Sequence, residues 1–158
     1  MIESVQPSDT NTALADWEAQ ARDHARRVAE TRPLNKAALF DALARAGITL
    51  ITVTFDGYGD SGQIECIDAY AGDAAIALPS DPIEIADPVY GSDTIERSAL
   101  PLRDAIEKLA YDFLEETHGG WEDNDGAYGD FTFDVATRAI TLAYNERHME
   151  SDYSEHVF

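Results

Sequence analysis

The chain has 158 residues and a net charge of −20, because 31 acidic residues face only 11 lysines and arginines. This length suits one domain with a core of its own, and 44% hydrophobic residues exclude a chain that is disordered throughout. Cys66 is the single cysteine, which excludes an intramolecular disulfide and a zinc site built from several cysteines. No apolar run is long enough to span a membrane and no signal-peptide pattern opens the chain, so we expect a cytoplasmic protein.

The negative charge is unevenly distributed along the chain. Residues 1–47 carry a net charge of −1, whereas residues 48–158 carry −19. Such a body repels nucleic-acid phosphates, so direct binding of DNA or RNA is disfavoured. Two interpretations stay open: a solvated surface that favours solubility, or a surface that competes with nucleic acid for a basic groove on another protein.

The N-terminal third is predicted to be helical after a mobile arm over residues 1–12. A helix over residues 13–31 carries a narrow apolar seam, formed by Leu14, Trp17, Ala21, His24 and Val28. Pro33 is expected to break this helix, and Asn35 to cap a second helix over 36–46 that ends at Gly47. The bases between Arg22 and Lys36 can neutralise the acidic body of the same chain or of a second copy.

The remainder alternates between strand and helix patterns. Strands are predicted over residues 48–55, 63–70 and 74–78, followed by an irregular connection over the proline-rich segment 79–100. A helix over 101–117 follows, and then strands over 131–135 and 140–144 that a short hairpin loop joins. The tail, residues 148–158, is a candidate edge strand.

These elements predict an α+β fold, with helices packed on a mainly antiparallel sheet and an additional N-terminal helix. A faint echo between residues 56–60 and 125–130, each rich in glycine and aspartate, suggests two α-β-β units. Chance explains the echo equally well, because glycine and aspartate are common turn residues. We divide the chain into an N-terminal arm and helix, residues 1–34, and an acidic α+β domain, residues 35–158.

Two glycine-rich matches do not predict catalysis. Residues 57–62 fit G-x-G-x-x-G, but a strand pattern follows where a dinucleotide site needs a helix. The tetrapeptide at 59–62 resembles the surroundings of a serine nucleophile, yet no histidine and aspartate occur in the required context. A hairpin turn is the better interpretation, and we expect no cofactor.

The acidic loop at residues 121–126 leaves the question of a metal open. Aligned as an EF-hand, it has Trp121 and Thr132 where ligands are required. A looser divalent-cation site of Asp123, Asp125 and Asp130 remains one alternative, and a solvated turn with Trp121 packed beneath it is the other. The histidines at 118, 148 and 156, together with Glu146 and Glu155, form either an acid–base or metal set or an exposed polar strand end.

Two motifs carry a family resemblance. They are FDGYGDSGQI at residues 55–64 and GGWEDNDGAYGDFTFD at residues 119–134, followed by NERH at 145–148. Together they resemble an uncharacterised family of small acidic bacterial proteins, often encoded on plasmids, phages and other mobile elements. The resemblance covers residues 35–158 and implies a setting on mobile DNA, without implying an activity or a catalytic residue.

The leading functional hypothesis is a non-enzymatic protein that binds the basic surface of a protein partner. In its specific form it is a nucleic-acid mimic that inhibits a host defence nuclease complex. The expected contacts are carboxylates of the two glycine–aspartate loops: Asp56, Asp60, Glu122, Asp123, Asp125 and Asp130. The alternatives are a metal-assisted enzyme that uses the loop aspartates with His118 or His148, and a scaffold that self-associates through residues 13–31.

Overall fold

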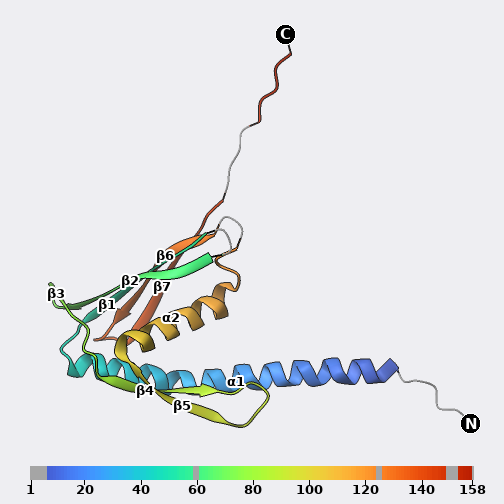
Figure 1. Ribbon diagram of the computed structural model, residues 1–158, viewed down its shortest axis with the longest axis horizontal. Coiled ribbons are helices and arrows are strands. Elements are labelled where there is room, and N and C mark those ends of the chain that lie inside the picture. Colours follow the sequence, from blue (N-terminus) through green and yellow to red (C-terminus); the bar gives the residue numbers. More distant parts are fainter. Residues whose placement is uncertain (1–6, 59–60, 124–125, 149–152, 158) are drawn as a thin grey trace, which may run out of the picture.

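The computed structural model describes residues 7–58, 61–123, 126–148 and 153–157, which form two helices and seven strands (Figure 1). In chain order the elements are α1 (Pro7–Arg45), β1 (Leu50–Tyr58), β2 (Ser61–Ala71), β3 (Ala74–Ile76), β4 (Pro82–Pro88), β5 (Ile95–Pro101), α2 (Leu102–His118), β6 (Ala127–Asp134) and β7 (Ala139–Glu146). No helix in the described part of the chain has the apolar length that a membrane crossing requires.

Five strands form one antiparallel sheet in the order β3-β2-β1-β6-β7, and β4 pairs with β5 in a separate hairpin. Both helices lie on one side of the five-stranded sheet, and the hairpin runs beside α1 (Figure 1). This confirms the predicted α+β fold. The order helix–strand–strand occurs twice, as α1-β1-β2 and α2-β6-β7, and the two halves join where β1 pairs with β6.

The core lies between the sheet and the helices because the strands alternate apolar and polar residues. Val53 and Phe55 of β1 and Phe131 of β6 are at most 1% exposed, and they point toward the helices. Buried side chains of the helices complete this core: Leu39, Phe40 and Leu43 from α1, and Leu102, Ile106, Leu109 and Leu114 from α2. The opposite face of the sheet, which we call the open face, turns toward solvent.

The predicted helix break at Pro33 is wrong, because α1 continues from Pro7 to Arg45. A proline inside a helix costs about 3 kcal/mol, since one backbone hydrogen bond is lost. Leu39, Phe40 and Leu43 are each fully buried, at about 1.5–3 kcal/mol per side chain, so tertiary packing outweighs the proline. The expected mobile arm over residues 1–12 is likewise helical from Pro7, whereas residues 1–6 lie outside the described part.

Asn35 was predicted to cap a second helix, and this prediction is wrong. Its side chain binds the β4–β5 hairpin instead. Its side-chain amide donates to the carbonyl of Ala86, and its side-chain oxygen accepts from the amide of the same residue, both at 2.9 Å. Asn35 is buried at 7% exposure, and it satisfies both polar backbone groups of one residue on the edge strand β4. The predicted boundary between residues 34 and 35 falls inside α1.

The expectation that residues 79–100 are irregular is also wrong, because β4 and β5 form a regular hairpin there. Pro82 and Pro88 stand at the two ends of β4, where a missing amide hydrogen interrupts no ladder. Ile83 and Ile85 point into the core between them. In the tail, residues 153–157 form no strand, so the described part adds no edge strand to the sheet.

Candidate functional site

The two glycine–aspartate motifs meet at one end of the five-stranded sheet. Antiparallel pairing of β1 with β6 places Asp56 opposite Tyr128 and Thr54 opposite Asp130. The connection from α2 to β6, which carries Glu122 and Asp123, closes the same end (Figure 1). Four of the six expected contact residues therefore gather here, and the other two, Asp60 and Asp125, lie outside the described residues.

Trp121 fixes the acidic loop to the sheet, as the packed-turn interpretation predicted. Its side chain is 5% exposed and meets Phe55 edge to face, with ring centroids 5.5 Å apart. The indole lies against Gly57 and Gly62, which are paired across β1 and β2. A Cβ at these positions would lie 2.7 Å and 2.5 Å from indole carbons, so both glycines make room for the tryptophan.

Gly126 brings the second motif into contact with the first. A Cβ there would lie 1.9 Å from the carbonyl oxygen of Gly57, and its φ of +80° also favours glycine. The loop before it turns through hydrogen bonds from Asp123 N to Gly120 O and from Gly126 N to Asp123 O, both 2.9 Å. These glycines therefore allow the backbone and the indole to pack closely. The first motif lies in the hairpin formed by β1 and β2, as predicted.

Arg147 binds this end together, a role that the sequence analysis missed. Its guanidinium Nη1 lies 2.8 Å from Asp56 Oδ1 and donates to the carbonyl of Gly57 at 2.9 Å. Its backbone amide donates to Gly126 O at 2.9 Å, and its guanidinium carbon lies 4.7 Å from the centroid of the Tyr128 ring. Asp56 is thus already paired within the chain. The one available signal was that Arg147 is the last basic residue before an acidic tail.

The remaining acids of the set differ in their surroundings. Asp123 and Asp130 are exposed, whereas Glu122 is half-buried and its Oε2 has no hydrogen-bond partner among the described residues. Nearby, the His118 ring stacks on the Tyr144 ring, with centroids 3.6 Å apart. Burial, reinforced by Glu146 and Glu122, raises the pKa of the Tyr144 phenol. The described residues contain no group of three or more metal-type side chains placed to hold an ion.

The open face adds acids that the sequence analysis overlooked. Asp68 of β2 and Asp134 of β6 alternate outward on the same face as Asp56 and Asp130, among threonines of β1, β6 and β7. Among the described strand residues on this face there is no lysine or arginine, and Arg147 stands just beyond the end of β7. These acids could have been found from strand alternation, because each lies an even number of positions from a residue that points outward on the same strand.

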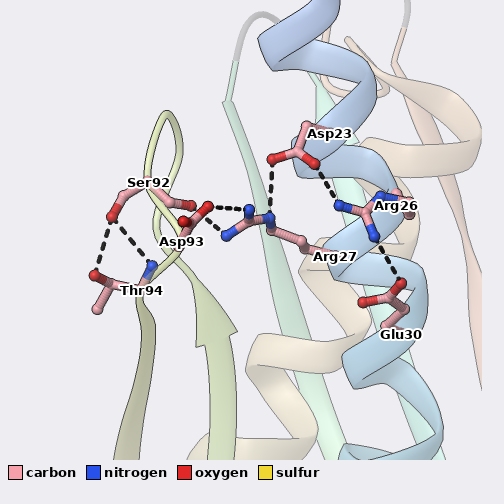
Figure 2. A network of polar contacts seen from close by, with 7 residues as sticks. All are labelled: Asp23, Arg26, Arg27, Glu30, Ser92, Asp93 and Thr94. Atoms are coloured by element: carbon pink, nitrogen blue, oxygen red, sulfur yellow. Dashed lines mark hydrogen bonds and ion pairs between the residues drawn. The ribbon is translucent and has the colours of Figure 1, made fainter.

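Cations gather instead on the helical side, where acids already pair with them. Figure 2 shows Arg26 bridging Asp23 and Glu30, and Arg27 reaching from Asp23 on α1 to Asp93 in the β4–β5 turn. The backbone carbonyl of Ser92 accepts a further hydrogen bond from Arg27 at 2.6 Å. Further pairs join Arg32 to Glu116, Lys108 to Asp87 and Asp112, Arg97 to Glu84, and Arg138 to Asp41. The basic part of α1 thus pairs with acids of its own chain, which is one of the two alternatives that the sequence left open.

Comparisons with known proteins give a family and no activity. The model of a family of unknown function, DUF6878, matches residues 31–158. No curated protein and no solved structure matches the chain.

Proposed function

The chain belongs to the DUF6878 family, whose function is unknown, and we propose from its geometry that it binds a basic surface of a protein partner without transforming it. The binding surface consists of the open face and the adjoining loop end. Its carboxylates are Asp56, Asp68, Asp130 and Asp134 on the face and Glu122 and Asp123 on the loop.

One observation carries this proposal: the internal ion pairs collect on the helical side and leave the open face acidic. Of the open-face acids, only Asp56 has an ion-pair partner among the described residues. Carboxylates that have no ion-pair partner among the described residues, on a sheet face that neither helix covers, hold a negative potential that steers positively charged partners toward it. The same potential repels nucleic acid, so a protein partner fits better.

The sign of these charges suits a partner that ordinarily binds nucleic acid, although they are spaced more widely than the charges of duplex DNA. From the standard spacing of strands and residues, Asp56 and Asp130 are about 8 Å apart, and Asp68 lies roughly 12 Å from Asp130. Duplex DNA presents about one negative charge per 1.7 Å of axis, so the open face is a sparser array of similar sign. The finer form of the proposal is therefore a mimic that occupies the basic groove of a host defence nuclease complex, in the mobile-element setting that the motifs suggest.

Affinity capture from a host extract, followed by binding measurements on the captured protein, tests the proposal. We expect the affinity to fall at high salt and duplex DNA to compete. The double variant Asp68→Asn/Asp130→Asn should weaken binding about tenfold or more. The matched control Asp81→Asn/Glu96→Gln changes the same charge on exposed residues elsewhere and should bind as the parent does.

Two outcomes would refute the proposal. One is an affinity that does not change with salt, because an acidic surface acting on a basic groove must be screened. The other is equal weakening by the test and control variants, which would mean that total charge matters and the open face does not.

A further inference from the structure

β7 is an unprotected edge of the five-stranded sheet. It is the last strand in the sheet order, and within the described residues its backbone ladder involves β6 alone. The strand is eight residues long, pairs without a register shift, and contains no proline, lysine or arginine. The opposite edge strand, β3, has only three residues. A long, regular edge whose single charged residue, Glu146, stands at its very end is the form of strand that pairs readily with another chain.

An apolar groove runs beneath this edge. It has a volume of about 240 Å³ and lies between β7 and the helices, lined by Ile140 and Leu142 of β7, Phe113 of α2 and Phe131 of β6. Ile140 and Leu142 are only half-buried, whereas Phe131 on the neighbouring strand is 1% exposed. The helical layer therefore stops short of the last strand and leaves apolar surface uncovered.

The rim of the groove carries more basic than acidic residues, in a strongly acidic protein. Arg32 and Lys36 of α1 line it together with Glu116 of α2. Arg32 pairs with Glu116, and Lys36 forms no ion pair among the described residues. An extended segment that fits here needs apolar side chains on one face and an acid between them.

The tail of the chain has this pattern. Tyr153 and Val157 are 83% and 90% exposed, and Glu155 stands between them at the same two-residue period. Residues 153–157 lie beyond the end of β7 and away from the body (Figure 1). In this position they are placed to reach the edge strand of another molecule.

We propose that the tail of one copy, residues 153–157, adds a strand antiparallel to β7 of a second copy, and reciprocally. Directly opposite residues of antiparallel strands share a face, so one register places Val157 of the second copy against Ile140 and its Tyr153 against Tyr144. The same register places its Glu155 over Leu142, beside Arg32 and Lys36. A twofold axis relates the two contacts and closes the assembly as a dimer. The open faces of both copies remain free.

Sedimentation of the full-length chain tests this proposal. The mass should approach twice 17.3 kDa with rising concentration. Glu155→Lys and Lys36→Glu should each weaken dimerisation at least tenfold, and their combination should restore it. Glu96→Lys, the same charge reversal on an exposed residue of β5, is the matched control and should dimerise normally. Val157→Asp changes a side chain that is 90% exposed and lies outside the core, and it should also give monomers.

Three results would overturn the proposal. The first is a monomer at every concentration, including one whose amides at 153–157 exchange slowly because the tail folds back on its own β7. The second is dimerisation that Val157→Asp leaves unchanged. The third is a dimer that Trp17→Glu abolishes while Val157→Asp does not, which would assign association to the exposed seam of α1 at Leu14 and Trp17.

Discussion

The contact between Gly62 and Trp121 offers a sharp test of how the two motifs depend on each other. In the variant Gly62→Ala, the new methyl group would lie 2.5 Å from Cη2 and 2.8 Å from Cζ3 of the indole, and 2.9 Å from Glu122 Cβ. Real Cβ contacts do not occur at such distances, so the indole and the acidic loop must shift. Overpacking of this kind costs about 1–3 kcal/mol.

The distances from each new methyl group to its neighbours predict the order in which a small series of glycine variants loses stability. Gly57→Ala should cost more than Gly62→Ala, because its methyl group also meets the Glu122 backbone at 2.9 Å, which cannot rotate away. Gly126→Ala should cost the most, since it meets a carbonyl oxygen at 1.9 Å and requires a positive φ. Gly119→Ala is the control, because its nearest contact is 3.3 Å and its φ is −54°.

Denaturant unfolding in a Trp17→Phe background measures the series, because Trp121 is then the single tryptophan. We expect Gly62→Ala to lower the free energy of unfolding by about 1–3 kcal/mol, or about 2–4 °C in Tm per kcal/mol, and to shift Trp121 emission to the red. A Gly62→Ala protein with unchanged stability and unchanged emission would refute the close packing of the Trp121 indole against Gly62.

Three further predictions concern single side chains. Asn35→Ala should lower the free energy of unfolding by about 2–4 kcal/mol, measured in urea, because both backbone groups of Ala86 lose buried partners; an unchanged midpoint would contradict this. Arg147→Ala should destabilise by roughly 1–2 kcal/mol, because the carbonyl of Gly57 and the carboxylate of Asp56 lose a charged donor, and Arg147→Lys should restore only part. Tyr144 should ionise above the usual phenol pKa of 10.0. As pH rises above 10, this tyrosine therefore loses its proton in the unfolded chain before it does so in the folded chain, and the free energy of unfolding falls. Ultraviolet titration of the parent protein and of Tyr144→Phe checks both the direction of the shift and the residue responsible.

Sequence patterns predicted those parts of the site that depend on local geometry, and they missed the parts that depend on contacts distant in the chain. The motif glycines marked a hairpin turn, and β1 and β2 do form that hairpin, with Tyr58 opposite Ser61. Trp121 was expected beneath the acidic loop and is buried there. Local sequence provided only a weak signal for Arg147, because the carbonyl of Gly57, to which its guanidinium donates, lies 90 residues away along the chain.

The two wrong secondary-structure predictions that rested on prolines share one cause. Pro33 and the prolines of residues 79–100 are strong local signals against regular structure. In the folded chain α1 and β4 lie against each other, and Asn35 bonds directly to Ala86. Burial of side chains across this contact stabilises both elements, and a short segment of sequence cannot reveal this stabilisation because the two elements are distant in the chain.

The amino-acid sequence alone determined the acidity, the α+β class and most strand positions, because composition and the two-residue period of a half-buried strand are local properties. The tertiary structure alone decided that the two motifs share one sheet end, that the cations pair on the helical side, and that β7 is an edge strand of the sheet. Those outcomes depend on strand order and on contacts between residues distant in the chain, which local periodicity does not encode.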